Sequence, residues 1–182
     1  MKRVLFIIGS MRKGSFNRQL AKVAEELLKG KAEVSYLEYS GLPYMNQDIE
    51  FPAPPDVERV RAEVEKADGI WIFTPEYNYQ IPGVLKNLLD WLSRPIVPGD
   101  RKTASSAGKA VTVSGAGGRN ATAGCRKQLG LLLASMQMRQ LKENETGIAL
   151  PGAAFAAGVY EPSEEDKAKL SAQAEAFAAF LG

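Results

Sequence analysis

I-I-G-S-M-R-K-G-S-F-N, residues 7–17, joins an apolar run to a helical pattern. The run Val4–Ile8 predicts a buried strand, and the apolar residues that follow at helical spacing predict an amphipathic helix from about Phe16. The start of a helix offers free backbone N–H groups and the positive end of the helix dipole, so it favours a phosphate. We expect Ser15 to cap this helix and Arg12 to add charged hydrogen bonds. The stretch therefore predicts a phosphate-binding loop.

The spacing of the glycines narrows the kind of phosphate. Gly9 and Gly14 have the spacing of a nucleotide-triphosphate loop, but Ser15 and Phe16 stand where that loop requires Lys and Ser or Thr. The dinucleotide fingerprint G-x-G-x-x-G fails because Met11 replaces its second glycine. A terminal monophosphate ester remains the candidate ligand, and an ordinary strand-to-helix turn with solvated charges is the alternative.

Composition bounds the class of protein. The chain has 182 residues, 45% of them hydrophobic and 24% charged, which suits one globular domain over 1–182. A net charge of +2 without a cationic run argues against nucleic-acid binding, and no apolar stretch predicts a membrane partner or a signal peptide. The single cysteine, Cys125, allows no internal disulfide and indicates a reducing, cytoplasmic setting.

The chain contains no histidine. This excludes Ser-His-Asp and Cys-His nucleophile systems and imidazole metal ligands, and no other residues suggest a metal site. If the chain is an enzyme, a bound cofactor could supply the reactivity instead, and we name no side chain as a catalytic acid, base or nucleophile.

Strands and helices alternate along the rest of the chain. Further strands are expected at 31–37, 69–74 and 109–113, with a fifth somewhere between 136 and 150. Helices are expected from 56, capped by Asp56, to 67, from Pro82 to before Pro95, from about 121 to 134, and from the cap Ser163 to 181. This order predicts an α/β fold with one parallel sheet covered on both faces.

Three loops follow the carboxyl ends of the expected strands, at 9–17, 74–81 and 114–120. Ligands of such folds bind beyond those ends, so the three loops should converge on one site. The second loop begins T-P-E-Y-N-Y at Thr74, a combination of proline, carboxylate, aromatics and amide that suits a flat heteroaromatic ring. The alternative is a turn with tyrosines on the surface.

The two motifs together carry a resemblance. G-S-M-R-K-G-S-F-N followed by T-P-E-Y-N-Y-Q-I-P-G resembles the NADPH-dependent FMN reductase family, including its chromate and quinone reductases. The resemblance implies a flavodoxin-like three-layer fold, with a five-stranded parallel sheet in the order 2-1-3-4-5. It also implies a set of FMN-binding residues: Ser10, Arg12, Ser15 and Asn17, with Phe16 in the same motif, for the phosphate; Pro75, Glu76, Tyr77 and Asn78 for the ring; and, more loosely, Ser114, Gly115 and Gly117 beside the ring.

The implied activity is that of an FMN-dependent oxidoreductase. NADPH or NADH would be the co-substrate, and a quinone, chromate, an azo or nitro compound, or free flavin would be the electron acceptor. The main alternative is an electron carrier like flavodoxin, against which the sequence pI of about 8.6 argues. A protein that binds a nucleotide only for regulation remains a further alternative.

Two further expectations concern self-association and the role of the single cysteine. The helix that begins at Pro82 carries Trp91 and Ile81 in addition to its core stripe, so we expect a homodimer or homotetramer, which the family resemblance also implies. Cys125 falls on the same helical face as Leu129 and Leu132, so we expect it to be buried and to play no part in catalysis.

Overall fold

The computed structural model describes residues 1–182 and contains one six-stranded sheet in which all pairings are parallel. Its main path runs β2-β1-β3-β4-β5, which confirms the predicted order 2-1-3-4-5. The strands are β1 Lys2–Ile8, β2 Ala32–Tyr36, β3 Gly69–Phe73, β4 Ala110–Gly117, β5 Arg139–Gln140 and β6 Gly147–Ala149.

The expected fifth strand is divided into two pieces, β5 and β6, which both pair with β4. Gln173, a residue of the last helix, bonds both to β4 and to the segment between β5 and β6. Its Oε1 accepts hydrogen bonds from the N–H of Thr146 at 2.9 Å and from the hydroxyl of Ser114 at 2.7 Å. A buried side chain thus replaces part of the backbone ladder, because buried N–H groups need a partner. These hydrogen bonds join distant parts of the chain, which explains why the strand could not be located from its sequence pattern.

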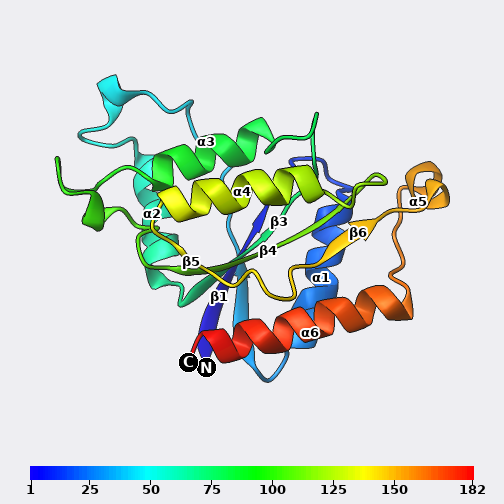
Figure 1. Cartoon of the computed structure of the whole chain (residues 1–182). Coiled ribbons are helices and arrows are strands. Elements are labelled where there is room, and N and C mark those ends of the chain that lie inside the picture. The colour runs from blue at the N-terminus through cyan, green and yellow to red at the C-terminus, as the bar shows by residue number, and fades with distance from the viewer.

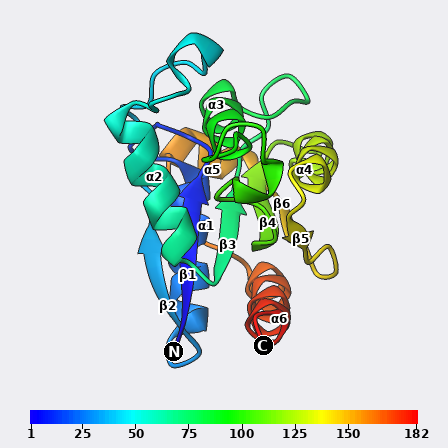
Figure 2. The same cartoon turned by 90° about the vertical axis from the view of Figure 1, so that its left-hand side faces the viewer.

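Helices cover both faces of the sheet (Figures 1 and 2). One face packs against α1 Phe16–Leu28 and α6 Glu164–Phe180 through residues such as Phe6 and Trp71. The other packs against α2 Pro55–Lys66, α3 Gly83–Leu92 and α4 Ala123–Ser135 through residues such as Ile7 and Ile72. A short helix, α5 Gly152–Ala157, follows β6. Neighbouring residues of one strand point to opposite faces, so a strand buried on both sides is apolar throughout.

The helix starts confirm one of the expected caps. Ser163 forms a capping box with Asp166 at the start of α6, as predicted. Asp56 is not the cap of α2, because the helix begins at Pro55 and Pro54 occupies the N-cap position. Ser15 occupies the N-cap position of α1, but its side chain makes no capping hydrogen bond. Its hydroxyl is therefore left for another partner.

Trp91 is fully buried, and its indole N–H donates to the carbonyl of Pro43 at 2.9 Å. The expectation that this side chain adds to an outer apolar surface of α3 is wrong. The loop that precedes α2 covers it. The indole hydrogen bond therefore holds this loop against α3. Because Trp91 is buried within the chain, it gives no support to self-association.

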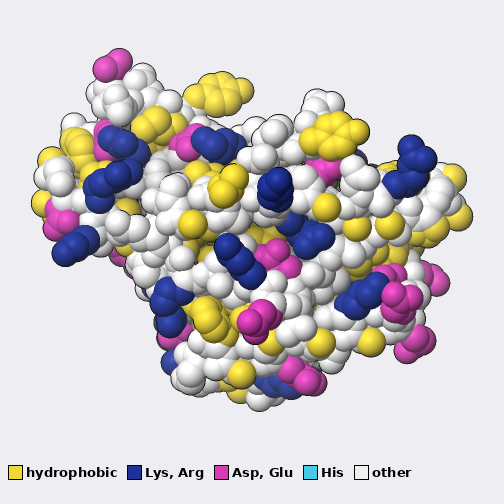
Figure 3. Space-filling model, viewed as in Figure 1, with side chains coloured by type: hydrophobic (Ala, Val, Ile, Leu, Met, Phe, Trp, Pro, Cys, Tyr) yellow, Lys and Arg dark blue, Asp and Glu magenta, His cyan; other side chains and the backbone are white.

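Both chain termini lie at the end of the sheet opposite α5 (Figures 1 and 2). Charged side chains of both signs are scattered over the face seen in Figure 3, in keeping with the small net charge. None of the helices has the length and apolar character that crossing a membrane requires.

Candidate functional site

The ends of β1 and β3 lie level with one another, whereas β4 continues three residues beyond them to Gly117. Residues 114–117 of the expected third loop therefore belong to β4. Ile8 of β1 pairs with Phe73 of β3, which in turn pairs with Ser114 of β4. The loops that follow therefore begin side by side, and the backbone binds them together: the N–H of Gly9 donates to the carbonyl of Phe73 at 2.8 Å, and that of Thr74 to the carbonyl of Ser114 at 2.9 Å. The convergence expected of these loops follows from this register.

A cavity of about 370 Å³ opens between the three loops. Nine of the twelve predicted FMN-binding residues line it: Ser10, Arg12, Ser15, Phe16, Asn17, Pro75, Glu76, Tyr77 and Gly117. Asn78, Ser114 and Gly115 do not. The structure thus brings together the first loop and the start of the second.

The phosphate loop presents unpaired polar groups to the cavity. Arg12 takes part in none of the ion pairs of the chain, and its guanidinium lies 4.8 Å from the centroid of the Phe16 ring. Ser15 is 2% exposed and does not cap the helix behind it. The first N–H groups of α1 have no acceptor within the helix. This arrangement offers one guanidinium, one hydroxyl and a helix start to an anion.

The side-chain amide of Asn17 forms its hydrogen bonds within the protein. Its side-chain amide donates to the carbonyl of Ala116 and accepts from the N–H of Ala116, both at 2.9 Å. Asn17 is 2% exposed, so this pair of bonds is buried. The residue lines the cavity, yet its main contacts join the phosphate loop to the end of β4.

Glu76 also makes an internal contact. Its carboxylate accepts a hydrogen bond of 2.7 Å from the backbone N–H of Cys125, in the first turn of α4. A carboxylate at this point satisfies a free donor and interacts favourably with the helix dipole. Glu76 therefore fixes the second loop against α4 while it lines the cavity.

The second loop then turns back on itself. Tyr77 and Gln80 exchange two backbone hydrogen bonds, and the residues between them, Asn78 and Tyr79, have φ of 52° and 63°. Two consecutive positive φ values are typical of a type I′ hairpin turn, which glycine usually occupies. The turn directs Tyr79 outward, 68% exposed.

Two of the three residues predicted to contact the ring from the third loop, Ser114 and Gly115, lie behind the lining of the cavity. Ser114 is fully buried; its hydroxyl accepts from the indole N–H of Trp71 at 2.9 Å and donates to Gln173 at 2.7 Å. At Gly115 a Cβ would collide with the Thr122 hydroxyl and would approach the carbonyl of Thr74 to 2.6 Å. Both residues shape the loop from behind, and Gly117 alone of the three lines the cavity.

Four residues of the cavity were not predicted: Ala116, Gly118, Leu150 and Phe155. Phe155 belongs to α5, and its ring meets that of Phe16 edge-on, with centroids 5.5 Å apart. The Pro151-Gly152 pair signals a turn in the sequence. Nothing local, however, indicates that the segment after it packs beside a helix more than a hundred residues earlier.

Cys125 is fully buried beneath the second loop, as predicted, with Sγ 3.5 Å from Oγ1 of Thr74. Leu129 is buried with it, and Leu132 is partly buried against the same cluster. Burial raises the pKa of the thiol to about 11. The thiolate that nucleophilic chemistry requires is therefore disfavoured.

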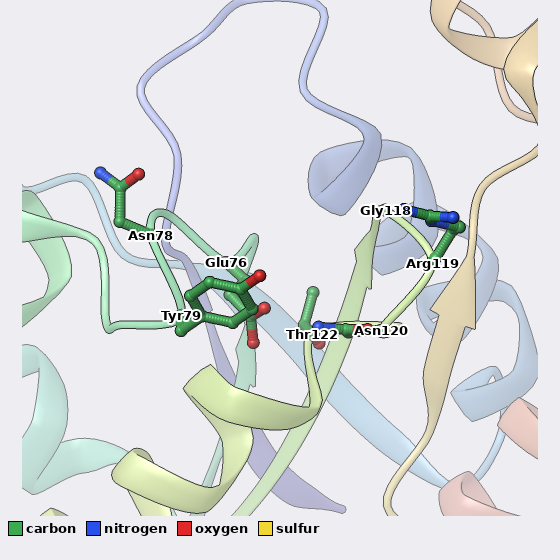
Figure 4. Close-up of a pocket in the computed structure, with 7 residues that line it drawn as sticks. All are labelled: Glu76, Asn78, Tyr79, Gly118, Arg119, Asn120 and Thr122. Carbon is green, nitrogen blue, oxygen red and sulfur yellow. The ribbon is translucent and has the colours of Figure 1, made fainter.

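A second, more polar cleft of about 360 Å³ adjoins the first and shares Glu76 and Gly118 with it. In Figure 4 the hairpin of the second loop forms one wall and the third loop forms the other. The residues that line it are Glu76, Asn78, Tyr79, Gly118, Arg119, Asn120 and Thr122.

Comparison with solved structures supports this description of the fold. FerB from Paracoccus denitrificans, a flavoenzyme NAD(P)H:(acceptor) oxidoreductase, is 31% identical and superposes with a TM-score of 0.87, over 100% of this chain and 97% of FerB. A flavodoxin from Streptococcus pneumonia is 15% identical with a TM-score of 0.64, which shows likeness of fold alone.

Sequence relatives include an NAD(P)H-dependent FMN reductase from Pseudomonas aeruginosa, 36% identical over 155 residues, or 84% of this chain and 80% of the relative. An NAD(P)H:quinone oxidoreductase from Solanum tuberosum is 45% identical over 98 residues, 51% of this chain and 50% of that protein. The match thus spans about half the length of the potato protein. The profile of the family described as NADPH-dependent FMN reductase matches residues 2–150. The chain therefore belongs to the NADPH-dependent FMN reductase family.

Proposed function

We propose that residues 1–182 form one FMN-binding reductase domain, an FMN-dependent NAD(P)H oxidoreductase that delivers electrons to a small acceptor. Bound FMN, held by the residues of the cavity, would supply the redox chemistry, namely hydride acceptance from the nicotinamide and two-electron transfer to the acceptor. A quinone is the acceptor we favour, with chromate, azo or nitro compounds and free flavin as further candidates. The name of the Solanum tuberosum relative supports a quinone, and the name of the Pseudomonas aeruginosa relative supports free flavin as a further candidate.

The polar end of the cavity fits the phosphate of FMN. Arg12 is an unpaired cation at its rim, and Ser15 is a nearly buried hydroxyl that makes no capping bond to its own helix. A guanidinium pairs with two oxygens of a phosphate at once, and the helix start adds N–H donors. The loop lacks the glycine that lets a backbone approach a pyrophosphate, so it favours FMN over FAD.

The other end of the cavity fits a flat ring. Pro75 and Tyr77 of the second loop and Leu150 after β6 line the cavity there. These side chains would orient the ring and exclude water from part of it. No side chain of this chain has to act as nucleophile or proton carrier in this scheme. Self-association and a reducing cytoplasmic setting remain predictions.

The observation that carries the proposal is the convergence of nine predicted residues on one cavity in which Arg12 has no ion-pair partner. The test begins with the visible spectrum of the purified protein, followed by titration of the flavin-free protein with FMN and with FAD. Steady-state oxidation of NADPH and NADH with a quinone then measures turnover. FMN binding without oxidation of either nucleotide would favour the flavodoxin-like carrier. Absence of flavin binding would contradict both.

A further inference from the structure

The short helix α5 has almost no core of its own. Ala154 is its one buried residue, whereas Phe155 lines the FMN cavity and is still 53% exposed. Figure 1 shows α5 at the edge of the molecule, beyond the end of β6. The match to the family profile ends at residue 150, so α5 lies outside the matched part of the chain. One wall of the cavity is thus provided by a segment that buries little of itself.

Both ends of this segment are anchored to other walls of the cavity. Before α5, the N–H of Leu150 donates to the end of β4 at 2.8 Å. After it, the side chain of Gln19 in α1 accepts from the N–H of Tyr160 at 2.8 Å and donates to the carbonyl of Gly158 at 3.1 Å. The same amide nitrogen donates to the carbonyl of Gly14 at 3.4 Å. Gln19 therefore ties the segment to the phosphate loop.

Between these anchors, α5 contacts the body of the protein through an aromatic pair. The ring of Phe155 meets that of Phe16 edge-on, with centroids 5.5 Å apart, and the guanidinium of Arg12 lies over the Phe16 ring at 4.8 Å. The three side chains form a row that leads from the exposed helix to the cation of the phosphate loop. Charged hydrogen bonds are stronger where water is excluded, so an apolar cover beside Arg12 would strengthen its pairing with a phosphate.

We propose that α5 is a lid over the phosphate end of the cavity and that Phe155 retains FMN once it has bound. The inference rests on the proposed function, because it requires FMN in this cavity. Lids come from parts of a fold with few buried contacts, since they have to open. Here opening breaks the contact between Phe155 and Phe16, and Gln19 limits the movement. The half-exposed ring of Phe155 can bury further apolar surface against a bound ligand.

The lid bears on the role of the flavin in the reaction. A flavin that leaves slowly stays through many turnovers as a prosthetic group, whereas a flavin that leaves quickly acts as a substrate. Free-flavin reduction through this cavity would require the second behaviour, and reduction of an external acceptor such as a quinone requires the first. By slowing departure, Phe155 would favour the external acceptor.

The test measures the exchange of bound FMN. FMN-loaded protein is mixed with an excess of isotopically labelled FMN, and mass spectrometry after rapid gel filtration follows the label that becomes bound. We expect Phe155→Ala to accelerate the exchange about tenfold, because it removes the aromatic contact and the cover together. Val159→Ala is the matched control, since Val159 is an apolar residue just beyond α5, 55% exposed, that does not line the cavity. It should exchange FMN at the wild-type rate.

Gln19→Ala tests the lid separately from the aromatic contact. Gln19 does not line the cavity, so it acts through the position of the segments that it joins. Loss of its bonds to Gly158 and Tyr160 should accelerate exchange severalfold, and adding Phe155→Ala should then have little further effect. Full additivity of the two substitutions would show that Gln19 acts through the phosphate loop alone, and it would overturn the lid.

Denaturant titration of the flavin-free variants checks that each is folded. Phe155→Leu keeps an apolar cover without the aromatic pair, and it should exchange FMN at a rate between those of the wild type and Phe155→Ala. Exchange at the wild-type rate in Phe155→Ala would overturn the inference, and so would equal acceleration by Val159→Ala.

Two results separate this inference from the function on which it rests. If the wild type binds FMN and oxidises NADPH, but Phe155→Ala exchanges FMN no faster, the inference is overturned and the proposed function stands. If exchange depends on Phe155 as expected but the wild type oxidises neither NADPH nor NADH, the lid stands and the proposed function fails.

Discussion

The loops after β1 and β3 contribute to the same cavity in different ways. In the first, at 9–17, Arg12 has no ion-pair partner and Ser15 does not cap its own helix. In the second, at 74–81, Glu76 is bonded to the start of α4, and the hairpin is closed by its own backbone bonds. The first loop keeps donors for a ligand, whereas the second uses its polar groups to hold a shape.

The difference matches what each end of FMN would require in the proposed complex. A phosphate is charged and needs several donors that the protein itself does not occupy. A flat ring needs walls at fixed positions, so residues that rigidify the walls contribute most. Asn17 is the exception in the first loop, because its amide is fully engaged with Ala116. Substitutions at these positions should therefore separate effects on stability from effects on affinity.

The largest effect, on the free energy of unfolding, is expected at Asn17. Asn17→Ala removes both 2.9 Å bonds and leaves the buried N–H and carbonyl of Ala116 without partners. Two such groups, at about 1–3 kcal/mol each, should lower the free energy of unfolding by about 2–6 kcal/mol. Denaturant titration of the flavin-free protein measures this directly. Unchanged stability would show that Asn17 serves the ligand and not the fold.

Arg12→Ala should have the opposite character. It should weaken FMN binding by about 1.5–3 kcal/mol, the range for a charged hydrogen bond, with little change in the stability of the flavin-free protein. Lys13→Ala is the matched control, since this neighbouring cation is exposed and does not line the cavity. Fluorescence titration with FMN provides both affinities. Equal affinity in the Arg12 variant and the wild type would rule out the phosphate placement.

A smaller effect is expected in the second loop. Glu76→Ala deletes the acceptor for the N–H of Cys125 and should cost about 1–2 kcal/mol of stability, as loss of a helix cap does. Glu76→Gln keeps an acceptor oxygen and should cost less than half as much. Thermal unfolding of the flavin-free variants tests the order. If Glu76→Ala reduced FMN affinity more than Arg12→Ala and left stability intact, the contrast between the loops would not hold.

The same contrast explains what the sequence could predict. The alternation of strands and helices and the convergence of three loops follow from apolar runs and turn residues, which are local signals, whereas the strand order was implied by the family resemblance. The two motifs located eight residues of the cavity, because short polar stretches stand out between apolar ones, and the glycine-rich stretch at 114–120 located a ninth, Gly117. They did not distinguish Arg12, which is free, from Asn17, which is engaged. That distinction depends on Ala116, 99 positions away in the chain.

The C-terminal third was harder to predict for a related reason. The division between β5 and β6 depends on Gln173, and the apolar wall at Phe155 depends on its contact with Phe16. Each is a pairing between segments far apart in sequence, and the segments that contain β5, β6 and α5 have no regular apolar pattern of their own. The buried Trp91 was misjudged in the same way, because the loop that covers it has no secondary-structure period.

The smallest effect is expected at Cys125, which lies under the second loop without lining either cleft. Its thiol is fully buried, and burial raises its pKa to about 11, so the reactive thiolate is disfavoured at pH 8. Turnover should therefore survive treatment with a thiol-alkylating reagent at that pH.

Cys125→Ser exchanges a small apolar group for a more polar one next to Thr74 and should cost on the order of 1 kcal/mol of stability. NAD(P)H-dependent quinone reduction should stay within a few-fold of the wild type, because electrons would pass through flavin alone. A second substitution, Cys125→Ala, removes the sulfur without adding a hydroxyl and should give the same rate. A folded, FMN-binding variant of either kind that lost turnover a hundredfold would show that the thiol takes part in the reaction.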